Sequence, residues 1–393
     1  MANVSSSNGL EKRPKLRFPG FDEPWKVFKA EELFQNVTDK NHPDETVLTI
    51  IQGKVTLPRE QAGRNIHYDD ASLSNYKKVE QGDFIIHLRS FEGGLEMANE
   101  AGIVSPAYTI LRCKRPHSSL FYDAYFHTDE FINHNLSKSV EGIRDGRQIS
   151  YEAFKWLGIP YCEPTEQEKI SNLFAALNER IAKQRDLVES LKKYKRGLLM
   201  HYFSDDKTQL WTQCSVSQIG KVITGSTPPT NDRSNYDGDL LFCAPGDVGE
   251  QKYISSTEKR VSPKGFALGR PLPPNSVIVT CIGLIGKLGI AKTSMITNQQ
   301  INALVVSEGF DHEFIYYAFE NFFPEYRSKV SMQTLPILSK SEFEKLMIKV
   351  PDLDVQHKIS SHLAAMDRRI EHTQQELNAL IEHRRGIMQQ LFI

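Results

Sequence analysis

The sequence is poor in cysteine, in net charge and in long apolar runs, and each shortage excludes a class of protein. Its five cysteines lie far apart without a C-x-x-C pair, so neither a disulfide framework nor a metal site is expected. No apolar run approaches the ~18 residues of a membrane-spanning helix. Residues 1–9 lack the basic start and apolar core of a secretory signal, and we expect a frayed tail there. Together these features predict a cytoplasmic protein with free thiols.

Net charge is also small, at −1 over 393 residues. A stand-alone DNA-binding protein is expected to be clearly basic. If this chain binds nucleic acid, its basic groups must therefore be clustered locally, or partner subunits must supply part of the attraction to phosphate. The length exceeds that of one ordinary hydrophobic core, which predicts two or more domains.

Catalytic motifs are missing as well. The glycine-rich stretch 283–289 lacks the order of a phosphate-binding loop because Cys281 stands where the first glycine is needed, so a tight bend is favoured. Neither Pro228-Pro229 nor Pro273-Pro274 is followed by the aromatic residue of an adenine methyltransferase. Pro351-Asp352 lacks the following Glu-x-Lys of a nuclease. We therefore expect a chain that is not an enzyme and that binds no metal or cofactor itself.

The chain repeats itself. A shift of 189 positions aligns residues 149–203 with 338–392 without a gap. The centre of the match is Gln167-Glu168-Lys169-Ile170-Ser171 against Gln356-His357-Lys358-Ile359-Ser360, and Phe203 matches Phe392 at its end. The segments before the matches have similar lengths but little common sequence, and each opens with a tryptophan, Trp25 or Trp211. One shared unit is thus combined with two different blocks.

Each shared segment ends in a long helix, over 165–203 and 354–393, and Thr165 with Glu168 forms a capping-box pattern before the first. Apolar residues three and four positions apart form a heptad seam, which favours pairing of the two helices over packing on a globular core. The polar positions Gln184 and Thr373 are expected to meet and to set the register. The predicted coiled-coil seam comprises Phe174, Leu177, Ile181, Gln184, Val188, Leu191, Leu363, Met366, Ile370, Thr373, Leu377 and Leu380.

Chain order decides the direction of this pairing. Parallel helices would force the second variable block to bridge a whole helix, ~58 Å for 39 residues at ~1.5 Å each. Antiparallel helices place the two joined ends side by side. The sequence therefore predicts an antiparallel coil with a pseudo-twofold axis, which carries one globular head at each end.

Both heads are α/β in character, so the whole chain is predicted to be α+β. In the second head, strands are expected at 239–242, 276–280 and 302–306, with a helix over Asp311–Glu325 that begins at an Asp311 cap and buries Phe314, Tyr317, Ala318 and Phe322. In the first head, strands are expected at 83–88 and 108–112, with a helix over 123–136.

The arrangement resembles the specificity (S) subunits of type I restriction–modification systems, over nearly the whole chain. The individually short strings that carry the resemblance are Pro14–Phe21 with Trp25, Ile149–Pro160, Glu166–Ile170, Lys193–Leu199, Gly225–Pro228 and Asn298–Asn302. The segment 348–353 departs from the family by lacking its usual proline-rich form.

The resemblance implies that residues 1–164 and 204–353 are target-recognition domains and that 165–203 and 354–393 are conserved spacer helices. It also implies that the chain binds double-stranded DNA and that two modification (methyltransferase) subunits dock on it. These subunits would carry S-adenosylmethionine and methylate adenine. A restriction/translocase subunit using ATP and Mg²⁺ is a further expected partner, and the chain itself would be non-catalytic.

In this interpretation the coil acts as a ruler. Two half-sites read by one rigid bar must face the same side of the duplex, about one helical turn or ~34–36 Å apart, and two different heads imply an asymmetric, gapped target. Side chains suited to base reading are candidates. They are Arg64, Arg89, Arg144, Arg147 and Gln148 in the first head, and Lys252, Arg260, Lys264, Lys287, Asn298, Gln299 and Gln333 in the second.

The matched basic pairs Lys195-Arg196 and Arg384-Arg385 are candidates for phosphate or for partner carboxylates. Two other functions stay open at this point. A coiled-coil adaptor that does not bind DNA would lack salt-sensitive, sequence-selective DNA binding in the presence of its partners. A stand-alone enzyme would need a catalytic constellation that the sequence does not contain.

Overall fold

The computed structural model describes residues 11–51, 55–62, 70–142, 148–249, 251–330 and 336–392. The chain divides into two compact units, one formed by Met1–Arg185 with Gln375–Ile393 and one by Asp186–Gln374. Each unit contains one globular part and a portion of both long helices. Predicted positions Arg64, Arg144, Arg147 and Gln333 lie outside the described residues.

The two long helices are α5 (Pro164–Tyr202) and α11 (Leu353–Phe392), against the expected 165–203 and 354–393. The predicted cap at Thr165 is wrong, because the backbone N–H groups of Glu166 and Gln167 donate to the carbonyl oxygen of Glu163, at 2.9 and 3.0 Å. Pro164 occupies the first helical position, where its missing N–H would have no helical partner. Thr165 is exposed inside the first turn.

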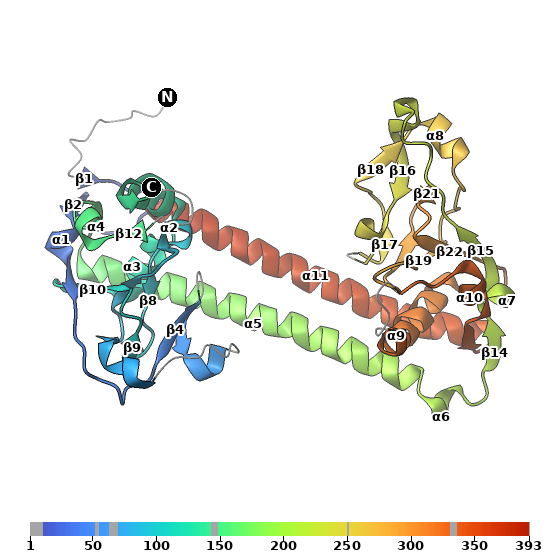
Figure 1. Cartoon of the computed structure of the whole chain (residues 1–393), viewed down its shortest axis with the longest axis horizontal. Coiled ribbons are helices and arrows are strands. Elements are labelled where there is room, and N and C mark those ends of the chain that lie inside the picture. Colours follow the sequence, from blue (N-terminus) through green and yellow to red (C-terminus); the bar gives the residue numbers. More distant parts are fainter. Residues whose placement is uncertain are drawn as a thin grey trace. The chain divides into compact units, whose positions relative to one another are not determined.

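The pairing of α5 with α11 is antiparallel, as predicted. In the first unit, the Phe174 ring stacks on Phe392 with 6.2 Å between centroids, and Gln184 Nε2 donates to Glu376 Oε2 at 2.8 Å. In the second unit, Lys195 pairs with Asp367 at 2.7 Å, and the Tyr202 hydroxyl contacts His362 Nδ1 at 2.5 Å. The partner's number falls as the number on α5 rises, in both units (Figure 1).

The predicted seam positions are all buried or half-buried. In α5, Phe174, Ile181, Val188 and Leu191 are buried, and Leu177 and Gln184 are half-buried. In α11, Leu363, Met366, Thr373 and Leu377 are buried, and Ile370 and Leu380 are half-buried. The Thr373 hydroxyl donates to the Arg369 carbonyl on its own helix at 2.7 Å. A direct Gln184–Thr373 pair stays a prediction.

The first unit contains small antiparallel sheets around an aromatic core. Trp25, Phe34, Phe84, Tyr122 and Phe126 are all fully buried there. One sheet has the order β1-β2-β13 (Glu11–Lys12, Trp25–Lys29, Gly158–Tyr161) and a second the order β3-β10-β7-β8 (Phe34–Val37, Thr109–Cys113, Phe84–Ile86, Glu96–Met97). Two-stranded pairs are β4-β5 (Leu48–Ile51, Val55–Pro58), β6-β9 (Lys77–Val79, Gly102–Val104) and β11-β12 (Val140–Glu141, Gln148–Ile149). Short helices are α1 (Ala30–Leu33), α2 (Ser90–Gly93) and α4 (Tyr151–Phe154), with 3₁₀ turns at Arg59–Ala62 and Asp70–Asn75.

The helix expected over 123–136 is interrupted. Helix α3 covers Ser119–Phe126, and a π-helical turn η3 (Glu130–Asn135) and a 3₁₀ turn η4 (Leu136–Ser139) follow it. Thr128 makes the break because its hydroxyl donates to the Tyr125 carbonyl at 2.7 Å and accepts from the Phe131 N–H at 3.1 Å. A side chain thus takes the place of helical backbone partners.

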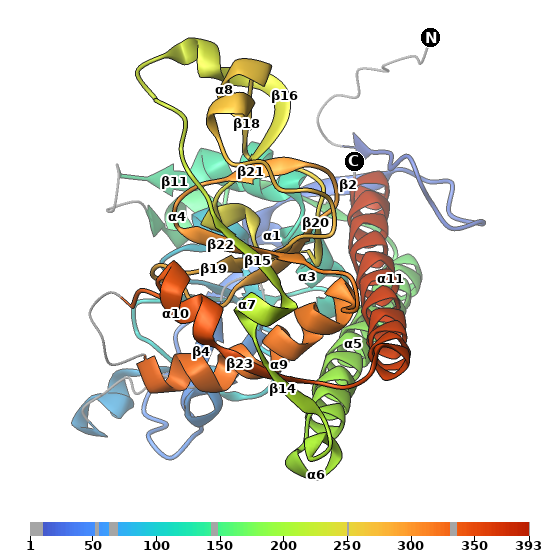
Figure 2. The same cartoon turned by 90° about the vertical axis from the view of Figure 1, so that its right-hand side faces the viewer.

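The second unit has a five-stranded sheet of order β15-β22-β19-β20-β17 (Gly220–Thr224, Ile301–Val306, Val277–Thr280, Leu288–Ala291, Tyr253–Ile254). Helix α9 (His312–Val330) contacts β19 and β20 of this sheet (Figure 2). A smaller sheet has the order β18-β16-β21 (Lys259–Val261, Tyr236–Cys243, Met295–Thr297), and β14 (Thr212–Ser215) pairs with β23 (Met347–Val350). Short helices are α6 (Asp205–Thr208), α7 (Val216–Ile219), α8 (Pro263–Leu268) and α10 (Lys340–Lys345), with 3₁₀ turns at Arg233–Asn235 and Pro245–Asp247.

Helix α9 begins as predicted at the Asp311 cap, where the carboxylate accepts from the Glu313 N–H at 3.0 Å. Phe314, Tyr317 and Ala318 are buried and Phe322 is half-buried. The helix is longer than the expected Asp311–Glu325 because it continues past Pro324 to Val330. Among the described residues, no helix combines the length and the hydropathy that would let it cross a bilayer.

Candidate functional site

Each long helix holds its neighbouring head through the same two repeated residues. In the first unit, the buried Gln167 accepts from the Ser118 N–H at 3.0 Å and donates to the Cys162 carbonyl at 2.8 Å. Ser171, one turn later, shares a 2.7 Å hydrogen bond with the Ser118 hydroxyl. Ser118 is the N-cap of α3, so α5 holds the start of this helix.

The second unit repeats this arrangement with different head residues. Gln356 accepts from the Asp311 N–H and donates to the Pro351 carbonyl, both at 2.9 Å. Ser360 donates to the Asp311 carboxylate at 2.5 Å, and Asp311 caps α9. The repeated string Gln-x-x-x-Ser is therefore the attachment point for two unlike heads.

Three aromatic rings pack together in each head in the same way. Trp25 packs edge-on against Phe121 of α3 at 5.5 Å and against Phe392 at 6.0 Å. In the second unit, Trp211 packs against Phe314 of α9 at 5.8 Å and against Phe203 at 5.9 Å. Phe203 and Phe392 are repeat partners, and Trp25 and Trp211 each open one of the two variable blocks. The shared framework thus extends from the helix start to the helix end.

The first unit adds a buried ion pair to this framework. Arg17 donates to both carboxylate oxygens of Glu166, at 2.9 and 2.8 Å, and the Trp25 indole N–H donates to the same carboxylate at 3.0 Å. Glu166 is only 1% exposed. Its three donors compensate the cost of burying the charge. The opening segment around Arg17 is thereby fixed to the start of α5.

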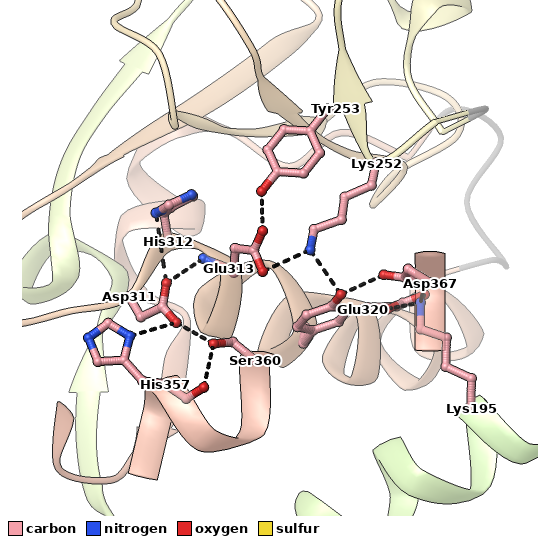
Figure 3. A network of polar contacts seen from close by, with 11 residues as sticks. Lys195, Lys252, Tyr253, Asp311, His312, Glu313, Glu320, His357, Ser360 and Asp367 are labelled. Carbon is pink, nitrogen blue, oxygen red and sulfur yellow. Dashed lines mark hydrogen bonds and ion pairs between the residues drawn. The ribbon is translucent and has the colours of Figure 1, made fainter. Parts of the chain in front are cut away.

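A network of charged groups joins three helices of the second unit (Figure 3). Lys195 of α5 contacts Asp367 of α11 at 2.7 Å and Glu320 of α9 at 2.9 Å. Burial lowers the pKa of Lys195, but the two carboxylates outweigh this effect and raise it. Tyr317 donates to Asp367 at 2.5 Å. Lys195, a candidate for phosphate or partner contacts, is thus engaged inside its own chain.

The predicted DNA contact Lys252 belongs to the same network. Its ammonium group lies 3.2 Å from Glu313, donates to the Tyr317 hydroxyl at 2.9 Å and lies 4.4 Å from the centre of that ring. Burial lowers its pKa, and only 12% of its side chain is exposed. Lys252 therefore supports the loop before β17, and like Lys195 it is poorly available to phosphate.

Two other basic candidates lie around the smaller sheet. Arg260 is exposed on β18. Lys264 on α8 pairs with Asp232 at 2.7 Å, and this hydrogen bond lowers the pKa of Asp232 to about 2. Both members of the pair are solvent-accessible, so the pair is expected to be weak and open to exchange with phosphate.

Two segments of the second unit, Gly225–Pro228 and Asn298–Asn302, contact each other. The Ser226 N–H donates to the Thr297 carbonyl at 2.8 Å, and the Thr227 hydroxyl donates to Gln299 Oε1 at 2.6 Å. Gly225 is required here because a Cβ would lie 2.2 Å from the Asn298 carbonyl oxygen. Both segments thus form one surface beside the turn between β21 and β22.

Within this surface the candidates differ in accessibility. Gln299 is exposed, whereas the half-buried Asn298 uses its side chain on Gln300, accepting from its N–H at 3.0 Å and donating to its Oε1 at 3.2 Å. Asn298 is better explained as a turn-forming residue, and Gln299 is the better placed of the two for base contact. Lys287 is half-exposed before β20.

In the first unit, the structure describes two of the five candidates. Arg89 is exposed at the N-cap of α2, where its N–H donates to His87 Nδ1 at 3.2 Å. Gln148 is exposed on β12, opposite Glu141. Helix α2 and strand β12 contact each other, so these two candidates belong to neighbouring elements of this head.

Sequence reasoning missed the anchoring role of Gln167, Ser171, Gln356 and Ser360, although these residues stood at the centre of the repeat. Their identity in two otherwise different contexts was the available signal. Across the described ranges, no group of three or more His, Cys, Asp or Glu side chains is arranged to hold a metal ion.

The sequence of the chain is similar to those of known proteins. The family model of the type I restriction modification DNA specificity domain matches residues 209–383. The chain is 30% identical over 178 residues to the type I restriction enzyme MjaIX specificity subunit of Methanocaldococcus jannaschii, which is 44% of this chain and 41% of that protein. It is 29% identical over 108 residues to the HindI specificity subunit of Haemophilus influenzae, 27% of this chain and 24% of that protein. The matches thus span less than half the length of either relative.

Solved structures resemble the chain over nearly its whole length. The S subunit of a type I restriction-modification system from M. genitalium superposes with a TM-score of 0.59 at 15% identity, covering 97% of this chain and 99% of that one. A chain from a structural study of the assembly and conformational transition of the type I R-M system gives a TM-score of 0.60 at 16% identity, covering 96% and 99%. At these identities the likeness establishes the fold.

Proposed function

Since the chain belongs to the type I restriction–modification specificity subunits, we propose that it reads a two-part, asymmetric DNA target for partner enzymes and catalyses no step itself. The globular blocks of residues 1–164 and 204–353 act as target-recognition domains. The paired helices set the spacing between the two half-sites. A DNA-independent adaptor role is the alternative.

The main support for this proposal is that the same attachment holds two different heads. Gln167 and Ser171 hold the Ser118 cap, and Gln356 and Ser360 hold the Asp311 cap, by matching hydrogen bonds. A symmetric framework that carries unlike surfaces suits a target whose halves differ in sequence. Helices of fixed length suit half-sites at a fixed distance of about one helical turn.

The partners follow from the same assignment. We propose that two methyltransferase subunits, each with bound S-adenosylmethionine, dock on this chain and methylate adenine in the target. A restriction subunit with ATP and Mg²⁺ would join the same complex. The near-neutral chain, of net charge −1, fits such an assembly because partner subunits can supply much of the phosphate attraction.

Sequencing of methylated bases tests the proposal. The chain would be co-expressed with an adenine methyltransferase subunit from the same organism in a host without adenine methylation. We expect a gapped motif modified on both strands, and no modification when either subunit is expressed alone. A contiguous motif, or methylation that is unchanged when this chain is omitted, would contradict the proposal.

In vitro binding separates the proposed reader from the adaptor. The assembled complex should bind the motif at least ~10³-fold tighter than unrelated duplex, and its affinity should fall steeply with salt. An adaptor would show no such preference for sequence, although it would still assemble with the methyltransferase.

A further inference from the structure

A glycine-bounded turn of the second unit presents an apolar side chain to solvent. Leu284 is 69% exposed and lies between Gly283 and Gly286, whose φ angles are 74° and 78°. The turn follows β19 and precedes β20. Glycine adopts these left-handed angles without strain, whereas other residues do so at a cost. The chain therefore places a leucine where it packs on little of its own structure.

The turn that carries Leu284 is held firmly. The Gly286 N–H donates to the Thr280 carbonyl at 2.8 Å, and the Thr280 hydroxyl donates to the Leu284 carbonyl and accepts from the Lys287 N–H at 3.0 Å. The Phe323 ring fills the space beside Gly286, where a Cβ would lie 2.5 Å from it. Leu284 thus extends from a fixed backbone.

A second exposed apolar residue lies on the segment paired with this turn. Ile337 is 54% exposed and forms a β-bridge with Ile282. The Gly283 N–H donates to the Pro336 carbonyl at 3.1 Å, so the two segments run side by side. We name Leu284 and Ile337 together the apolar tip.

Polar candidates for base contact border the apolar tip. Lys287 ends the turn, and the Cys281 N–H donates to the Gln300 carbonyl at 2.8 Å. This second contact attaches the turn to the Asn298–Gln300 loop, which carries the exposed Gln299. The apolar tip and the polar surface described above are therefore parts of one region.

We infer that Leu284 is an apolar wedge that enters between stacked bases of the bound duplex, with Ile337 beside it. Leucine and isoleucine are among the side chains that proteins insert at base steps, which partly unstacks and bends the DNA. The inference rests on the proposed function and adds to it a residue that bends the bound DNA. Two apolar side chains on a narrow turn form a small surface, which suits a base step better than the ~800 Å² that each partner contributes to a standard protein interface.

The test uses the full chain assembled with its methyltransferase and duplexes that carry the motif identified by methylation sequencing. The adenine analogue 2-aminopurine, placed in turn at each adenine of either strand of the half-site except the methylated one, reports unstacking by a rise in fluorescence. We expect the complex to produce this rise at one step. Leu284→Ala should abolish it and weaken specific binding about tenfold, with non-specific binding and its salt dependence unchanged.

Two further variants control the test. Leu284→Met keeps a long apolar side chain and should retain both signals. Leu210→Ala removes another exposed leucine of this unit, 97% exposed, and should behave like the unmodified complex.

Unchanged fluorescence and affinity in Leu284→Ala would overturn the wedge. A Leu284→Ala chain that assembles poorly with the methyltransferase, yet binds DNA normally once assembled, would also overturn it and would identify a protein contact. Lack of sequence-selective binding by the unmodified complex would instead contradict the proposed function itself.

Discussion

At the residue scale, Glu166 illustrates how the first head is attached. Its buried carboxylate serves Arg17 and the Trp25 indole together. Sequence alone placed Glu166 in a family string at the start of a helix but could not identify its partners, since Arg17 lies 149 positions away. Lys252 and Lys195 show the same limit, because their carboxylate partners lie far along the chain, on helices α9 and α11.

Removing the Glu166 carboxylate should destabilise the first unit strongly. Glu166→Ala leaves the Trp25 indole N–H without an acceptor and leaves the half-buried Arg17 guanidinium only the Glu23 carbonyl, and we expect a loss of about 3 kcal/mol. Hydrogen exchange of the backbone amides in α3 measures this loss of stability. Glu168→Gln, on the exposed face of the same turn, should change exchange little. Equal protection in Glu166→Ala and the unmodified chain would refute the role of this carboxylate.

His127 should make the first unit sensitive to alkaline pH. Burial lowers its pKa, but the Glu96 carboxylate, 3.6 Å from Nε2, and the Asp123 carboxylate outweigh this and raise it to about 9. The folded pKa exceeds the unfolded value of ~6.5, so the stabilisation is complete below pH 6.5 and is lost as pH rises through 9. This difference corresponds to about 3 kcal/mol.

Urea unfolding between pH 6.5 and 9 checks the prediction. Burial also raises the pKa of Asp123, whereas the nearby His127 opposes this shift. His127→Gln should remove most of the pH dependence, whereas His134→Gln, with 66% of its side chain exposed, should preserve it. A pH dependence that survives in His127→Gln would assign the effect to other groups.

At the scale of elements, the long helices and their repeat were predictable, and the details of the heads were not. Heptad periodicity and chain order determine the antiparallel pairing of α5 and α11. The strand expected at 239–242 is β16 over Tyr236–Cys243, since apolar runs locate a strand better than its ends. The interruption after α3 depends on Thr128, whose hydroxyl bonds to backbone in a way that composition does not reveal.

Gln167 and Gln356 should each stabilise the head next to their own helix, and to a similar extent. Gln167→Ala leaves the Ser118 N–H and the Cys162 carbonyl without partners, and Gln356→Ala does the same to the Asp311 N–H and the Pro351 carbonyl. Each change is expected to cost about 1–3 kcal/mol. Hydrogen exchange should increase in α3 for the first variant and in α9 for the second.

Gln389→Ala, an exposed position of α11, is the matched control for both variants. If Gln167→Ala and Gln356→Ala both left exchange unchanged, the repeated string would have no anchoring role. Similar losses of exchange protection in the two variants would show that the same attachment holds both heads.

At the scale of the whole molecule, the central claim is that one framework spaces two different readers. Composition gave no indication of DNA binding, because the chain is nearly neutral. The internal repeat indicated one scaffold with two different recognition surfaces, and the family resemblance implied that these surfaces bind DNA. The choice of bases stays beyond reach because individual side chains such as Gln299 and Arg260 are compatible with either base or phosphate contact.

Deletion of one heptad from both helices tests this claim most directly. Removing residues 182–188 and 371–377, which are equivalent in the repeat, preserves antiparallel pairing and shortens the coil by ~10 Å. Methylation sequencing and selection from a library of gapped duplexes would then define the target of the variant. We expect unchanged half-sites with a gap about three base pairs shorter, at ~3.4 Å per base pair. An unchanged gap, or altered half-sites with the original gap, would contradict the claim.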